Sequence, residues 1–196
     1  MSTKFRRARQ RRRLIVLVLA AALVACAAVY FTVTQHSPND GAASQPRGEI
    51  GVDDGYLESG DSISPFAVEL PALANLDPAL REAMQAAAEA ALADGVDFVV
   101  TSGWRSERYQ QALFDEAVRD YGSAEEASRH VSPAATSAHV TGTAVDIGFT
   151  DANSWLSQHG ADYGLCQMYA NEMWHFELAT TPGGECPPQL PDASNR

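Results

Sequence analysis

Residues 137–146 read SAHVTGTAVD, and residues 172–175 read EMWH. Each stretch adjoins a predicted strand, residues 143–148 in the first case and residues 174–178 in the second. Two histidines, one aspartate and one glutamate stand in these stretches. Whether the four side chains meet depends on how the two strands pair, so these stretches decide both the fold and the site that it carries.

The parity of the first strand separates core side chains from site side chains. Side chains alternate between the two faces of a strand, so Val145 and Ile147 are expected to face the core while Asp146 points the other way. Gly142 permits a sharp turn before the strand. This turn would bring His139, in the preceding loop, close to Asp146.

The second strand follows the same rule. Trp174, Phe176 and Leu178 are expected to face the core, and His175 and Glu177 to share the polar face. His175 is thereby presented by a strand that is otherwise anchored in the core.

The combination of these side chains predicts a zinc site. Catalytic zinc is held by three protein ligands and keeps a fourth position open for water, and His139, Asp146 and His175 form such a set. Glu172 has the wrong parity to share the face of His175, so it is expected in the turn that Asn171 introduces, beside the metal, where a carboxylate can serve as base. Taken singly, His175 could be a core histidine and Asp146 a strand-end cap, but the set together favours zinc.

The elements around these strands predict an α+β fold rather than a repeating parallel unit. Capping signals and apolar patterns predict a helix from Asp77-Pro78 to Gly95, a strand at 98–101, a helix at 107–121, a short helix after Ser123 and a helix at 151–159. A small antiparallel sheet with flanking helices would fill the domain, which we place at residues 65–190, followed by a tail at 191–196.

The N-terminal part is not globular. Residues 1–13 are rich in lysine and arginine and precede an uncharged apolar run, so 14–34 is predicted to be a transmembrane anchor with the basic tail in the cytoplasm. A cleaved or uncleaved export signal is the alternative, and Cys26 also stands where a bacterial lipoprotein would be lipidated. Each of these interpretations delivers the rest of the chain outside the cytoplasm.

Residues 35–64 are rich in Gly, Pro, Asp and Ser and predict a flexible linker. The three histidines outside the two stretches lie in this linker or near predicted helix ends, where surface roles are expected: His36, His130 and His159. No internal repeat is visible.

Charge and cysteine usage agree with export. Seven of the 14 basic residues precede the apolar run and all 25 acidic residues follow it, which leaves the exported part with a formal charge of −18 and argues against nucleic acid as a partner. Cys166 and Cys186 are the two cysteines beyond Cys26 and are expected to form a disulfide, with two separate buried thiols as the alternative. The single lysine, Lys4, lies in the cytoplasmic tail, which excludes the serine-lysine route to peptide hydrolysis.

The two stretches together resemble the VanY-type D-alanyl-D-alanine carboxypeptidases, which belong to the LAS group of zinc metallopeptidases. The pattern Ser-x-His-x-x-Gly-x-Ala-x-Asp followed by Glu-x-Trp-His carries the resemblance, and residues 102–106, SGWRS, with Gln110, match a further segment of that family. Trp104 stands where tyrosine is commoner, and residues 133–136 lack the glycine often found before the serine.

The resemblance implies a LAS/Hedgehog-like fold and one Zn²⁺ held by His139, Asp146 and His175. It implies Glu172 as general base and Arg105 as the group that stabilises the oxyanion. It places three further residues near the substrate, which are therefore candidate binding residues: Ser137, Gln110 and Trp174. Glu177 either orients a ligand or is a solvated strand carboxylate.

Three functions remain open on the sequence alone. The first is a DD-carboxypeptidase that removes the terminal D-Ala from peptidoglycan stem peptides ending in D-Ala-D-Ala. The second is a peptidoglycan endopeptidase, favoured by the scarcity of cations that could bind a terminal carboxylate. Arg108 is a weak candidate for that task, and a role on the helix surface is the favoured alternative for it. The third is a non-catalytic, zinc-stabilised wall-binding ectodomain. The oligomeric state is not indicated.

Overall fold

The two long helices begin at the caps that the sequence predicts. Asp77 accepts hydrogen bonds from the Ala79 and Leu80 amides at 2.8 and 3.3 Å, and α3, Pro78–Ala93, starts there with proline at its first position. Ser106 accepts a hydrogen bond from the Tyr109 amide at 3.2 Å and starts α4, Glu107–Tyr121. The predicted bounds of both helices are confirmed.

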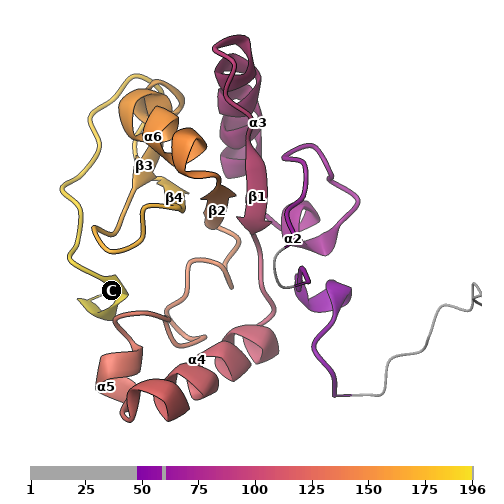
Figure 1. Ribbon diagram of the computed structural model, residues 1–196, viewed down its shortest axis with the longest axis vertical. Helices are drawn as coiled ribbons and strands as arrows, with labels where there is room; N and C mark the ends of the chain where they lie inside the picture. Colours follow the sequence, from indigo (N-terminus) through magenta and orange to yellow (C-terminus); the bar gives the residue numbers. More distant parts are fainter. Residues whose placement is uncertain (1–47, 59–60, 196) are drawn as a thin grey trace, which may run out of the picture. The chain divides into compact units, whose positions relative to one another are not determined.

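The computed structural model describes residues 48–58 and 61–195. Within this part of the chain the remaining helical elements are short: η1 Val52–Asp54, α2 Pro71–Ala74, α5 Ala124–Ala127, α6 Thr150–His159, η2 Gly160–Tyr163 and η3 Ala193–Asn195. In Figure 1, α3 and α6 lie toward the top and α4 with α5 toward the bottom, with the strands between them.

Four short strands form one antiparallel sheet in the order β1-β2-β4-β3. Their bounds are β1 Val99–Ser102, β2 Ala144–Gly148, β3 Leu165–Gln167 and β4 His175–Leu178. A small antiparallel sheet with flanking helices is the predicted α+β architecture. The strand β3 was not predicted, because three residues are too few to show a period.

The register places three polar residues in one row across the sheet. Ser102 on β1 lies opposite Asp146 on β2, and Asp146 lies opposite His175 on β4. Side chains of opposed residues project from the same face with Cβ atoms about 5 Å apart. The pairing of β2 with β4 therefore brings two of the predicted ligands together before any loop is considered.

The core lies on the other face, against α3 and α6. It contains Leu80 and Met84 of α3, Val145 and Ile147 of β2, and Phe176 of β4, all at most 1% exposed. Truncating one of these large side chains to alanine would cost about 2–5 kcal/mol. The prediction that Val145, Ile147 and Phe176 face the core is confirmed.

Two side chains predicted to share this core do not. Trp174 is 44% exposed and Leu178 is 38% exposed. Because β4 begins only at His175, Trp174 belongs to the preceding turn and is free of the strand's alternation, and Leu178 is the last residue of the strand. Of the three side chains predicted to face the core from this strand, only Phe176 is buried.

Part of the segment predicted to be a flexible linker packs against the domain. Residues 52–54 form η1, Asp54 is buried, and Ile63 pairs with Val100 of β1 through two backbone hydrogen bonds of 2.8 and 2.9 Å. Composition suggested a linker because glycine and aspartate are abundant there. Here, however, they serve a tight turn and a buried ion pair.

The predicted basic tail and the predicted anchor at 14–34 lie outside the described residues. Among the residues that the structure describes, no helix has both the length and the apolar character needed to cross a bilayer.

A disulfide joins Cys166 on β3 to Cys186, the pair that the sequence predicts, with Cα atoms 5.7 Å apart. Beyond it, Leu190 bridges to Tyr169 and exchanges backbone hydrogen bonds with the same segment. The C-terminal stretch is thereby attached to the loop that leads into β4.

Candidate metal centre

Three buried side chains converge at the end of the β2–β4 pair. The Asp146 Oδ1 atom lies 3.4 Å from His139 Nε2 and 3.3 Å from His175 Nδ1, and one donor atom from each of the three residues lies within 4.8 Å of the others. The three residues are 3–6% exposed. This is the set that the sequence predicts, and the geometry allows the three groups to share one metal ion.

His139 reaches this position from the loop before β2. Gly142 has a φ of +73°, and a Cβ at this residue would overlap the Asn75 carbonyl oxygen. The Gly142 carbonyl accepts a hydrogen bond from the Asp77 amide at 2.8 Å, which ties the turn to the start of α3. Glycine is therefore required here both for backbone conformation and for space.

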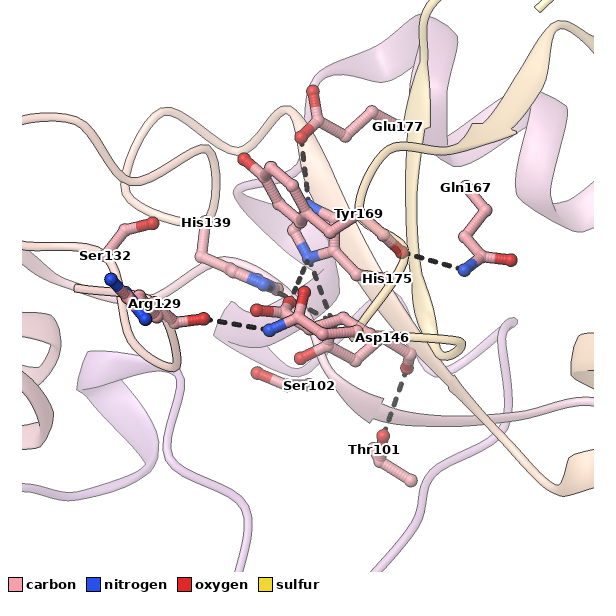
Figure 2. A network of polar contacts seen from close by, with 12 residues as sticks. Thr101, Ser102, Arg129, Ser132, His139, Asp146, Gln167, Tyr169, His175 and Glu177 are labelled. Carbon is pink, nitrogen blue, oxygen red and sulfur yellow. Dashed lines mark hydrogen bonds and ion pairs between the residues drawn. The ribbon is translucent and has the colours of Figure 1, made fainter. Parts of the chain in front are cut away.

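Hydrogen bonds on the outer sides of both imidazoles select the tautomers that a metal requires. His139 Nδ1 donates to the Gly103 carbonyl at 2.8 Å, which leaves the Nε2 lone pair facing Asp146. His175 Nε2 lies 2.9 Å from Glu177 Oε1, which leaves Nδ1 facing Asp146. Figure 2 shows Glu177 and Asp146 at opposite sides of the His175 ring. Each histidine thus directs its other ring nitrogen toward the common point, where the neutral ring can bind a metal.

The electrostatics of the three groups suit a cation. Burial opposes a charge on Asp146, but His139, His175 and Arg105 hold its pKa well below the usual range. Burial and the nearby Arg105 lower the pKa of His139, which favours the neutral ring. Burial opposes protonation of His175, but Asp146 and Glu177 outweigh it and raise its pKa to about 9. Because a ligating imidazole is neutral, metal uptake would displace that proton.

Glu172 lies beside the three groups without belonging to them. Its Oε2 atom is 3.7 Å from His175 Nδ1, and the residue lies between two turns ahead of β4, as the parity argument predicts. Burial raises the pKa of Glu172 to about 7. A carboxyl group with a pKa near neutrality can both accept and return a proton.

Arg105 is fixed by three side chains. Its Nε donates to Ser102 Oγ at 2.8 Å, Nη1 to Gln110 Oε1 at 3.0 Å and Nη2 to Asp146 Oδ2 at 3.0 Å. Asp146 therefore divides its oxygens, one facing the histidines and one facing the guanidinium. An arginine side chain carries five N–H groups, so two remain for another acceptor.

A pocket of about 260 Å³ opens above this centre and is lined by all three residues predicted to bind substrate, Ser137, Gln110 and Trp174. Gln110 is buried and also donates to the Ser132 carbonyl at 2.7 Å, so both ends of its amide are engaged. Its position suits orienting Arg105. Ser137 is buried in the wall, and Trp174 is at the exposed rim.

Sequence reasoning missed several contributors to the site. The Gly103 carbonyl that orients His139 has no side-chain signal, and Tyr169, whose ring centroid is 4.9 Å from that of His175, lies in a stretch without periodicity. His130, expected on the surface, also lines the pocket while its ring stacks on Tyr121.

The weak expectation that Arg108 binds a substrate carboxylate is wrong. Its guanidinium instead forms an ion pair with the buried Asp54. Arg108 is also absent from the residues that line the pocket.

A buried His-Asp-His set with a carboxylate and an arginine beside it is the constellation of a mononuclear metallohydrolase. The family model described as VanY, D-alanyl-D-alanine carboxypeptidase, matches residues 73–181. The chain belongs to this family, and the resemblance noted from its motifs is confirmed.

Several known proteins are similar to this chain. A D-alanyl-D-alanine carboxypeptidase of Enterococcus faecalis (strain ATCC 700802 / V583) is 32% identical over 139 residues, which are 57% of this chain and 52% of the relative, so the chain spans about half of that protein's length. Among solved structures, a mutant of the vancomycin resistance D,D-pentapeptidase VanY from a VanB-type resistance cassette, in complex with Zn(II), is 28% identical with a TM-score of 0.49, covering 52% of this chain and 71% of its own. VanYB in complex with D-alanine-D-alanine is similar at the same identity and TM-score, covering 52% and 70%.

Proposed function

We propose that this protein is a zinc-dependent D-alanyl-D-alanine carboxypeptidase that removes the terminal D-Ala from peptidoglycan stem peptides. The observation that carries the proposal is the placement of Glu172, 3.7 Å from His175, beside three buried groups that can share one ion. Family membership supports the reaction and its substrate class.

The donor set fits zinc. Two imidazole nitrogens and one carboxylate oxygen are ligands that zinc accepts in catalytic sites, and three protein ligands leave a further position open. His139, Asp146 and His175 would hold the ion, and a zinc ion bound there would polarise the scissile carbonyl and lower the pKa of a water toward about 7.

The protein's own groups would carry the remaining steps. Glu172 takes the proton of the attacking water and returns it to the amine of the leaving D-Ala, which its pKa near 7 permits in both directions. Arg105 directs its two uncommitted N–H groups at the oxygen that gains negative charge, a contribution of about 3–4 kcal/mol for a well-placed donor. Gln110 and Ser102 keep the guanidinium in that orientation.

Release of D-Ala from a muramyl pentapeptide by the purified full chain tests the proposal. Activity should disappear with a chelator, return with zinc, and fall by about 10²–10⁴-fold in Glu172→Gln with zinc content unchanged. Glu185→Gln, at a glutamate away from the pocket, should behave as the parent protein. A zinc-loaded chain that releases no D-Ala above the buffer rate would refute the proposal.

Digestion of cross-linked substrates by the same purified chain separates carboxypeptidase from endopeptidase activity. Mass spectrometry of products from cross-linked muropeptides distinguishes loss of one D-Ala from cleavage inside the bridge. A C-terminally amidated pentapeptide adds a second comparison, because a carboxypeptidase needs the terminal carboxylate. A non-catalytic wall-binding role would leave all these substrates intact.

We also propose that residues 14–34 anchor the chain in the membrane and place the domain outside the cytoplasm. The basic cluster before an uncharged apolar run supports this topology. Cell fractionation of the full chain and of a Cys26→Ala variant separates a protein anchor from a lipid anchor, since only the latter needs the cysteine. Recovery of the full-length chain in the soluble fraction would contradict both.

A further inference from the structure

A segment outside the family match is bound against the loop that carries Arg105. Residues 49–56 precede the matched region, 73–181, and were expected to be linker. They contact residues 103–106, which connect β1 to α4, and the Tyr56 ring packs edge-on against Tyr109 at 5.7 Å between centroids. We refer to residues 49–56 as the clamp segment.

Asp54 is the centre of the clamp segment. It is 5% exposed, and its Oδ1 accepts hydrogen bonds from Ser106 Oγ at 2.7 Å and from Arg108 Nε at 2.6 Å. Its Oδ2 accepts from the Gly51 amide at 3.1 Å and from Arg108 Nη2. Arg108 also donates to the Glu49 carbonyl at 2.9 Å. One carboxylate thus gathers donors from its own segment and from the first turn of α4.

The backbone of the clamp segment holds both neighbours of Arg105. The Ser106 amide donates to the Asp54 carbonyl at 2.9 Å, and Gly55 packs so closely that a Cβ there would overlap the Trp104 carbonyl oxygen. On the opposite side, the Arg105 amide donates to the His139 carbonyl at 3.1 Å. The loop is therefore held between the clamp segment and the segment that supplies a metal ligand.

We propose that Asp54 is a positioning residue for the reaction: through Ser106 and Arg108 it fixes the loop that aims the Arg105 guanidinium into the pocket. This inference rests on the proposed function, because Arg105 matters only if charge develops beside it. Arg105 lies three residues beyond the end of β1, a strand whose register with β2 shifts between Val100 and Ser102. Ser102 and Asp146 of the sheet bind the guanidinium, whereas the backbone of the loop that carries Arg105 is held by contacts from outside the sheet.

Asp54→Asn tests the role with minimal change in shape. The carboxylate accepts four hydrogen bonds, whereas an amide in either orientation turns its NH₂ group toward donors. Asp53→Asn is the matched control, because Asp53 is adjacent and exposed. We expect Asp54→Asn to lower kcat by about 10- to 100-fold with KM within about twofold and zinc content unchanged, since a misplaced group far from the chemistry can cost about 10² in rate.

Coupling to Arg105 separates positioning from a general loss of stability. In an Arg105→Ala background, Asp54→Asn should change kcat by less than about twofold, because the group that it positions is gone. The inference is overturned if Asp54→Asn lowers kcat by the same factor in both backgrounds, or leaves kcat unchanged in the parent protein.

The proposed function can fail without leaving the inference untested. If the parent chain releases no D-Ala, the function is refuted, and the ¹⁵N signal of Arg105 Nε becomes the readout. Asp54→Asn should then shift that signal and speed its exchange with solvent, while Asp53→Asn leaves it in place. An unmoved Arg105 Nε signal in Asp54→Asn would overturn the positioning role.

Discussion

Two different means place Arg105 and the side chains that can share one metal ion. Asp146 and His175 are opposed residues in a sheet, so their spacing follows from the same backbone pairing that holds β2 to β4. Arg105 lies beyond the end of β1, in a loop pinned from outside by the clamp segment. The difference implies that disturbing the sheet row abolishes the site, whereas disturbing the loop leaves the site assembled but less effective.

The largest effect is expected at Asp146, the residue that joins the two regions. Asp146→Asn keeps the shape but removes the charge shared by two histidines and Arg105, so metal binding and D-Ala release should both fall to background. Zinc analysis of the purified protein and the release assay measure this. Asp162→Asn, an exposed carboxylate, serves as control. Full zinc content in Asp146→Asn would contradict the view that the sheet row is essential for the site.

Glu177 tests the support of this row, because it binds the outer nitrogen of the His175 ring. Glu177→Gln weakens the hydrogen bond that fixes the His175 tautomer, so zinc affinity should fall by about 10- to 100-fold while saturating zinc restores most of the rate. Competition with a chromophoric chelator gives the affinity. Unaltered zinc affinity would show that Glu177 is only a buried strand carboxylate.

Gly55 and Gly95 test the loop without touching any polar group. Both have a φ near +80°, but a Cβ at Gly55 would overlap the Trp104 carbonyl, whereas a Cβ at Gly95 meets open space. Backbone strain should cost about 1 kcal/mol of stability in either alanine variant, and the overlap with Trp104 should add a further cost in Gly55→Ala. Only Gly55→Ala should also lower kcat, by about tenfold, with zinc retained. Equal kcat values in the two variants would mean that the loop tolerates displacement.

The smallest effect concerns acid stability. Burial alone would raise the pKa of Asp54, but hydrogen bonds from Arg108, Ser106 and the Gly51 amide outweigh it and lower the pKa. Because the folded pKa is depressed, the stabilisation is fully present above pH about 4 and is lost as pH falls through the folded pKa. Arg108 is half exposed, so at most about 1 kcal/mol is expected. The difference in unfolding free energy between the parent protein and Asp54→Asn should therefore shrink as the pH falls below about 4. Acid denaturation of both proteins measures this difference, and a difference that stays constant with pH would argue against the prediction.

Local rules sufficed for most of the helices and for the side chains that converge at the candidate metal centre. Asp77-Pro78 and Ser106 mark helix starts because capping is a short-range interaction, and strand parity was enough to place Asp146 and His175 on one face. The parity rule failed at Trp174, where a turn replaces the strand.

The clamp segment was beyond the reach of such rules. Asp54 and Arg108 are 54 residues apart, and a glycine- and aspartate-rich stretch has the composition of a linker until a distant arginine is known to meet it. Likewise, the Gly103 carbonyl contributes to the site through backbone alone. Long-range partners of this kind are set by the tertiary fold, and composition carries no trace of them.

The Cys166–Cys186 bond closes a covalent ring across a sequence separation of 20 residues, and that ring encloses both Glu172 and His175. Closing a loop of this length removes about 3 kcal/mol of conformational freedom from the unfolded chain. Thiol reductants would therefore affect the protein in two ways. They would open the ring around the proposed base and one proposed ligand, and they would offer soft sulfur donors that compete for zinc. An assay that contains such a reagent would show one loss of rate, to which reduction of the disulfide and removal of zinc both contribute.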